Sequence, residues 1–242
     1  MLFMAPMPEA CTNHDETTLF RQSWTLYDAL SEMNYMFHRE VYEQVGQLLA
    51  ERHERGPWSM LDLGCGNARF LGPCLQRTPP SSYTGVDLSP AALEEAGTTY
   101  LKGLGRVTLC CQDMLEAVEQ AGESHDVIFS SYAVHHFGSA LKQRLFQACS
   151  RRLKAGGCFV LVDIAREEGQ SREDYLDGYI STMRSEWKRV PPTQLDEACA
   201  HVAAFDFPET LSTLTRMAEE AGLTKSRLIG RHAQHHVLVF EA

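Results

Sequence analysis

The sequence lacks long apolar runs, internal repeats and low-complexity tracts, and its basic side chains are outnumbered. No stretch approaches the roughly 20 apolar residues of a membrane-spanning helix, so we expect no membrane partner. With 22 Lys and Arg against 32 Asp and Glu, the formal net charge is −10, which argues against a partner held mainly by phosphate neutralisation, such as bulk DNA. A hydrophobic share of 44% over 242 residues excludes disorder as the main state and suffices for a full core.

The eight cysteines include no C-x-x-C pair, and most lie in apolar runs such as residues 157–160. A zinc site built on cysteine needs closer clusters. The histidines near the C-terminus do not indicate a metal either, because His235 and His236 would point to opposite faces of a strand. Residues 1–10 carry no positive charge ahead of their apolar stretch, unlike a secretory signal. We therefore expect a cytoplasmic protein with reduced thiols and no bound metal.

The chain divides by its hydrophobic pattern into three parts. We expect a flexible N-terminal arm over residues 1–18, a helical cover over 19–54 and a main domain over 55–242 with a lid insertion at about 167–207. In the main domain, five short apolar runs alternate with helical segments, which predicts a mostly parallel α/β sheet with right-handed crossovers. The strands are expected at 60–63, 83–87, 106–111, 125–130 and 158–164, the helices at 89–101, 141–153 and 208–221, and a closing hairpin at 224–228 and 235–240.

A glycine turn follows the first of these strands. Gly64 and Gly66 would let backbone N–H groups approach a ligand at the start of a helix. Asp87 ends the next strand about 20 residues later, where a carboxylate can accept hydrogen bonds from ribose hydroxyls. The third glycine of a dinucleotide fingerprint is replaced by Arg69, and the sequence contains no G-x-x-x-x-G-K-[ST] motif for a nucleoside triphosphate.

These residues carry a family resemblance. The run 61–67, Leu-Asp-Leu-Gly-Cys-Gly-Asn, resembles the first motif of small-molecule class I S-adenosylmethionine-dependent methyltransferases, and further similar motifs follow in the family's order. The likeness covers about residues 55–165 and continues weakly to the C-terminus. Asn67-Ala68 and Ala155 depart from the usual pattern. The matching later segments are 85–89, 112–114, 126–130 with 134–137, and 153–157.

The resemblance implies a Rossmann-like, doubly wound, mostly parallel seven-stranded sheet with a C-terminal antiparallel hairpin and helical lid elements. It implies S-adenosyl-L-methionine as cofactor, with Asp87 on the ribose and Asp113 with Met114 on the adenine. Two alternatives stay open from the residues themselves: Asp113 as a helix N-cap and Met114 as core packing. The cofactor-binding residues implied are Asp62, Gly64, Cys65, Gly66, Asp87, Leu88, Asp113, Met114 and Ser130.

The predicted activity is in-line methyl transfer to an O, N or C atom of a small-molecule acceptor, for which the protein mainly aligns the reactants. A general base is needed only if the acceptor must lose a proton, and the catalytic candidates are His135, His136 and Tyr132. Candidates for binding the acceptor are aromatic and histidine side chains of the cover and the lid, for which ordinary core packing is the alternative: Tyr27, Tyr35, His38, Tyr175, Tyr179 and Trp187.

Other functions remain open at this stage. A protein or RNA methyltransferase and a non-catalytic cofactor-binding subunit would share the same motifs. The acidic charge argues against RNA, as does the sequence Ser-Ser-Tyr-Ala at 130–133, where an N-P-P-[YF] motif would stand. The sequence does not indicate the oligomeric state. We expect a small-molecule acceptor and no nucleic-acid partner.

Overall fold

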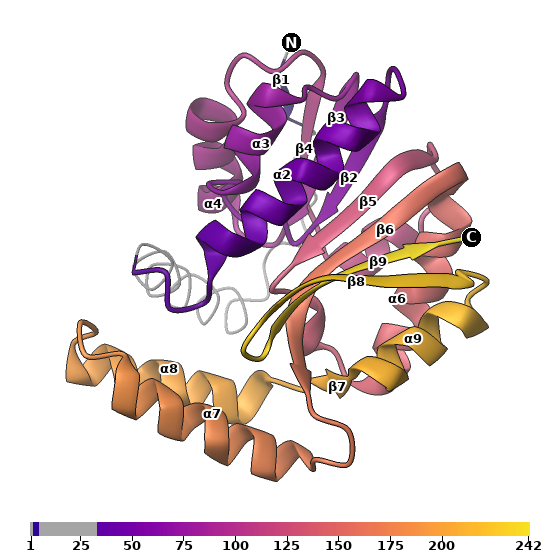
Figure 1. Cartoon of the computed structure of the whole chain (residues 1–242). Coiled ribbons are helices and arrows are strands. Elements are labelled where there is room, and N and C mark those ends of the chain that lie inside the picture. The colour runs from indigo at the N-terminus through magenta and orange to yellow at the C-terminus, as the bar shows by residue number, and fades with distance from the viewer. Residues whose placement is uncertain (1, 5–32) are drawn as a thin grey trace.

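The computed structural model describes residues 2–4 and 33–242 (Figure 1). Most of the predicted arm and the first part of the predicted cover, including Tyr27, fall outside these ranges. Leu2–Met4 forms strand β1, within the segment predicted as a loose arm, and pairs in parallel with β4 (Val107–Cys111) at the edge of the sheet. Within the described residues, none of the helices combines the length and apolar character needed to cross a bilayer.

The seven predicted strands are all present, in a mostly parallel sheet that β1 and the two-residue strand β7 (Glu209–Thr210) extend to nine. These seven strands follow the order β4-β3-β2-β5-β6-β9-β8, so the order reverses between β2 and β5, where α/β sheets bind their ligands. All pairs are parallel except those of β9, which runs antiparallel to β6 and to β8. The remaining bounds are β2 (Ser59–Leu63), β3 (Ser82–Asp87), β5 (His125–Ser131), β6 (Leu153–Arg166), β8 (Lys225–His232) and β9 (His235–Glu241).

Helices cover both faces of this sheet, and the alternation of side chains along β6 shows how. Val160 and Val162 belong to the core under α2, α3 and α4, whereas Phe159 and Leu161 belong to the core under α5, α6 and α9. The first layer comprises α2 (His38–Glu54), α3 (Leu71–Arg77) and α4 (Pro90–Glu95), which continues as the π-helical turn η2 (Ala96–Tyr100). The second layer comprises α5 (Met114–Glu119), α6 (Ser139–Arg152) and α9 (Leu211–Glu220).

Two boundaries differ from the prediction. The strand predicted at 158–164 already begins at Leu153 as β6, and residues 154–157 bulge from it, because His125 pairs with Leu153 and Val127 with Cys158. Lys154 in this bulge donates to Asp126 at 2.8 Å. The predicted helix at 208–221 begins only at Leu211, since β7 (Glu209–Thr210) pairs with the end of β6 and the Thr210 hydroxyl caps α9.

The predicted insertion consists of two helices, α7 (Arg172–Glu186) and α8 (Pro192–Phe205). Figure 1 shows them side by side below the sheet, where β6 extends past its neighbours. Their facing sides form an apolar cluster of their own, which includes Ile164 at the end of β6. This cluster anchors the helix pair to the carboxyl edge of the sheet, where open α/β sheets hold their ligands.

A buried acid lies beneath that edge. The Asp62 carboxylate accepts a 2.7 Å hydrogen bond from the Tyr83 hydroxyl, and the two side chains are 2% and 1% exposed. Burial raises the pKa of Asp62 to about 7; the nearby Asp87 carboxylate adds to this effect and the hydrogen bond from Tyr83 opposes it. The carboxyl of Asp62 therefore keeps its proton to higher pH in the folded chain than in the unfolded chain.

We predict that Asp62→Asn removes a pH dependence of stability. Between about pH 4 and 7 the folded chain holds a proton that the unfolded chain has released, so the native free energy of unfolding falls as pH rises through this window. Relative to the native chain, the variant should gain stability between pH 5 and pH 8, by at most about 3 kcal/mol. Urea unfolding at both pH values measures this difference. The exposed Asp177→Asn is the control, and an equal offset of Asp62→Asn at both pH values would contradict the assignment.

Candidate cofactor and acceptor site

The glycine turn follows β2 as predicted. Gly64 and Gly66 have φ angles of 73° and 51°, which glycine adopts without strain. A Cβ on Gly64 would lie 2.7 Å from the Cβ of Ala133, which follows β5. The absence of a side chain at Gly64 thus lets the loops after β2 and β5 meet. The N–H groups of Gly64 and Cys65 both donate to the Val86 carbonyl, which fixes the turn against the end of β3.

Asp87 joins this turn to the end of β3. Its carboxylate accepts hydrogen bonds from the N–H groups of Gly66 and Ser89, each at 2.8 Å. Burial raises its pKa, against these hydrogen bonds, which lower it. Leu88 is half-buried, and its carbonyl oxygen accepts a bond from the Cys111 thiol. A carboxylate has about four acceptor positions, so Asp87 retains capacity for a further donor such as a ribose hydroxyl.

Asp113 and Met114 have the two structural roles left open by the sequence, as helix N-cap and as core residue. Asp113 is the N-cap of α5, accepting hydrogen bonds at 2.9 Å from the N–H groups of Leu115 and Glu116. Met114 packs in the core, and its sulfur lies 3.6 Å from the position that a Cβ on Gly64 would take. Met114 therefore also borders the glycine turn. Their contact with an adenine stays a prediction.

Three of the predicted cofactor residues support the turn from below. Besides Asp62, the Ser130 hydroxyl donates a 2.8 Å hydrogen bond to the Leu63 carbonyl and so ties β5 to the residue before Gly64. The Cys65 thiol is directed to the Gly66 carbonyl, and burial raises its pKa. A direct contact of these three side chains with the cofactor stays a prediction.

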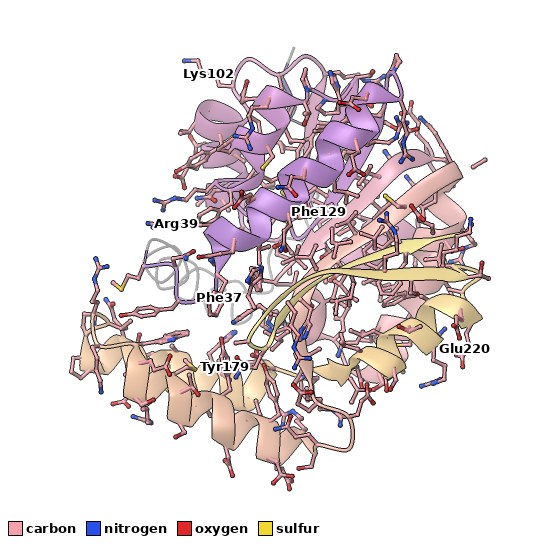
Figure 2. The ribbon with its side chains drawn as sticks, in the orientation of Figure 1. Phe37, Arg39, Lys102, Phe129, Tyr179 and Glu220 are labelled. Carbon is pink, nitrogen blue, oxygen red and sulfur yellow. The ribbon has the colours of Figure 1, made fainter. Side chains whose placement is uncertain are left out.

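Most of the predicted acceptor residues meet in one aromatic cluster, which we define as Tyr35, His38, Tyr132, Tyr179, Trp187 and His235. Tyr132 lies 5.0 Å from His38 and 5.5 Å from His235, measured between ring centroids. Tyr179 lies 6.1 Å from His235 and 6.3 Å from Trp187. Tyr35 stacks on Trp187 at 5.2 Å. Figure 2 shows Tyr179 between α7 and the sheet, below Phe37.

The histidines of this cluster are neutral at pH 7. Burial lowers the pKa of His38 to about 4 and that of His235 to about 3. Sequence reasoning considered His235 only as a metal ligand and missed its place in this cluster. Its position at the start of the last strand, opposite Ile164 at the end of β6, could have indicated it. The aromatic cluster is thus a buried, uncharged wall at the carboxyl edge of the sheet.

Tyr175 extends this wall to a cavity of about 300 Å³ between α7 and the turn of the β8–β9 hairpin. Its ring lies 5.8 Å from that of Tyr179, and its hydroxyl has no hydrogen-bond partner among the described residues. Glu167, Gln170, Arg231 and Gln234 add polar groups to the lining. Residues of the glycine turn do not line this cavity, so it lies on the lid side of the aromatic cluster.

His135 and His136 belong to a different group. They lie on the short 3-10 helix η3 (Val134–His136), where their ring centroids are 4.1 Å apart, and the ring of His136 also contacts that of His201. Burial lowers the pKa of His136 to about 3. Burial also lowers the pKa of His135, but the carboxylates of Asp163 and Asp206 outweigh it and raise that pKa overall. Sequence reasoning missed both aspartates, although a charged residue inside the apolar run of β6 was a signal for Asp163.

The comparisons with known proteins agree with this geometry. Residues 60–157 match the family model of a methyltransferase domain. A ribosomal RNA large subunit methyltransferase G of Pseudomonas putida is 32% identical over 106 residues, which are 42% of this chain and 28% of that protein. The chain therefore spans less than a third of the length of the curated relatives it matches.

Solved structures share the fold at low sequence identity. An O-methyltransferase family protein of Burkholderia thailandensis has a TM-score of 0.63 and 16% identity, over 88% of this chain and 57% of that chain. Human N-acetylserotonin methyltransferase in complex with its cofactor has a TM-score of 0.61 and 15% identity, over 95% of this chain and 59% of that chain. Residues 60–157 thus resemble a methyltransferase domain, and the glycine turn and the strand order fit the fold that the chain shares with these solved methyltransferases.

Proposed function

We propose that the chain transfers a methyl group from S-adenosylmethionine to a small-molecule acceptor with a flat, apolar body. The observation that carries this proposal is that the glycine turn lies next to the aromatic cluster. Ala133 touches the glycine turn, and the preceding residue, Tyr132, belongs to the aromatic cluster. An acceptor packed against these rings would therefore lie beside the cofactor. Aromatic and neutral imidazole rings favour flat, uncharged partners.

When bound, S-adenosylmethionine would supply an activated methyl group: the bond from its sulfonium sulfur to the methyl carbon would break as the bond to the acceptor forms, with a neutral thioether as the leaving group. The residues of this chain have to align the two reactants and exclude water. Asp87 and the backbone of the glycine turn would hold the nucleoside, while Asp113 and Met114 would border its base. The aromatic cluster would position the acceptor and keep water out. A hydroxyl or N–H acceptor also loses a proton, which passes to a neighbouring base or to water.

His135 and His136 have weak support as general bases. Tyr132 is better supported, as a residue that lines the acceptor site. The Nε2 atom of His135 faces Asp206 at 3.6 Å, and its other ring nitrogen is engaged by Asp163. A general base needs a free nitrogen directed at the acceptor. His235 has a buried Nδ1 without a hydrogen-bond partner among the described residues, but burial lowers its pKa to about 3, which makes it a weak base.

Methylation of RNA is the second candidate, favoured by the likeness to the ribosomal RNA methyltransferase. The net charge of −10 supports the small molecule, because RNA binding relies on neutralising phosphates. A cytoplasmic location also stays a prediction. It is supported by the cysteines of the described residues, which form no disulfide.

Asp87→Asn tests the cofactor site. Calorimetric titration of the native chain should show binding of S-adenosylmethionine and S-adenosylhomocysteine and none of NAD. The variant should bind both nucleosides at least about tenfold more weakly, because it loses charge-assisted hydrogen bonds to the ribose. Asp177→Asn, which removes the same charge from an exposed site on α7, should bind like the native chain. Retained affinity in a folded Asp87→Asn variant would refute the ribose role.

Tyr179→Ala tests the acceptor site. Tritium from the labelled methyl group should appear in low-mass products of a metabolite extract and not in protein-free ribosomal RNA. The variant should reduce this transfer at least tenfold while leaving the cofactor affinity within about twofold, since the ring of Tyr179 packs against His235, Trp187 and Tyr175. Ser181→Ala, on the exposed side of α7, is the control. Label in the RNA would favour the second candidate, and cofactor binding without any transfer would indicate a non-catalytic subunit.

A further inference from the structure

A buried carboxylate lies where the lid rejoins the main domain. Asp206 is the first residue after α8, and its side chain is 5% exposed. Its Oδ1 atom is buried and has no hydrogen-bond partner among the described residues. An unsatisfied carboxylate oxygen in such a position costs free energy unless a cation or a proton compensates it. The negative charge of the buried Asp206 carboxylate therefore needs a cation or a proton close to Oδ1.

Two imidazoles face this oxygen. The Nε2 atom of His135 is 3.6 Å away and the Nδ1 atom of His136 is 3.7 Å away. The three side chains each offer one ligand atom, and these atoms lie within 4.8 Å of one another. The nearest basic side chains are directed elsewhere. Lys142 donates to the Phe207 carbonyl and lies 3.9 Å from Glu209, and Arg172 donates to the backbone oxygen of Asp206.

Asp163 orients one of the two imidazoles. Its carboxylate contacts the Nδ1 atom of His135 at 2.5 Å and accepts the backbone N–H of the same residue at 2.8 Å. This arrangement places the proton of a neutral imidazole on Nδ1 and leaves the lone pair of Nε2 directed toward Asp206. Histidines that bind metals are held in the same way, with a carboxylate on the nitrogen that does not bind the ion.

We propose that His135, His136 and Asp206 bind one divalent transition-metal ion, for which zinc is the best fit. Zinc binds imidazole nitrogen and carboxylate oxygen at about 2.0–2.2 Å in a tetrahedron, so its ligand atoms stand roughly 3.4 Å apart. The measured separations of 3.6 and 3.7 Å are close to this value. Binding through Nδ1 of His136 requires the Nε2–H tautomer and replaces its 3.2 Å contact with the Phe205 carbonyl.

The ion would link the insertion of α7 and α8 to the main domain. His135 and His136 follow β5, and Asp206 ends α8, so the ligands come from the main domain and from the insertion. At least one coordination position is left for water or for His201, whose ring centroid lies 5.4 Å from that of His136. The absence of metal expected from the sequence rested on cysteine spacing and on the C-terminal histidines. A sequence pattern does not show that His135 and His136 meet Asp206, which lies 70 positions after His136 in the chain.

Zinc chloride titrated calorimetrically into the full chain, after treatment with a chelator, tests this site. We expect one ion per chain and a thermal midpoint that rises by roughly 5–10 °C when free zinc exceeds the dissociation constant about a hundredfold. Asp206→Asn and His136→Gln should each weaken binding at least tenfold. His125→Gln, a buried histidine at the start of β5, should bind zinc like the native chain.

Cobalt(II) provides an independent measurement on the native chain, in case a variant fails to fold. Cobalt bound to two imidazoles and a carboxylate in a tetrahedral site should give intense visible absorption that zinc displaces. Absence of binding to the native chain would overturn the proposal and assign the compensation of Asp206 to a proton on His135. Equal binding by the native chain and the folded variants would also overturn it, because the ion would then occupy another site.

Discussion

The hydrogen bond from the Gly66 N–H to the Asp87 carboxylate is the constraint on which the rest of the site depends. It joins the loop after β2, in which Gly64 and Gly66 have positive φ angles, to the end of β3. Gly64 then brings the loop after β5 into contact with the same turn. Three neighbouring strands thus end at one point, and the aromatic cluster is positioned relative to that point through Tyr132.

Much of this arrangement could be predicted from the sequence, because its signals are local. Apolar runs ending in glycine or aspartate predicted β2 and β3, and Ser89-Pro90 predicted the start of α4, where the Ser89 hydroxyl does accept the N–H of Ala92. Strand order follows from general rules of α/β topology once the family motifs are recognised. The predicted boundaries of strands and helices were wrong where long-range contacts determine them, as at the bulge of 154–157, where Lys154 donates to Asp126.

The composition of the side-chain clusters could not be predicted. The sequence indicated that Tyr179 and Trp187 would face the site, but not that His235 would join them from the far end of the chain. It also grouped Tyr132 with His135 and His136, which are neighbours in sequence. The positive φ angle of Tyr132 and the short helix η3 turn these side chains to different surroundings. Such a separation depends on backbone angles at single residues, for which a sequence pattern carries no signal.

The two edges of the sheet determine whether copies of this chain can pair their sheets in solution. A strand with an unpaired edge can recruit the strand of another molecule and begin aggregation. Here β1 occupies the edge beside β4 with three residues. At the opposite edge, β8 carries Lys225, Arg227 and Arg231, and its pairing with β9 is irregular between Leu228 and Gly230. Positive charge and broken register oppose strand addition there, so copies of the chain should resist joining sheet to sheet.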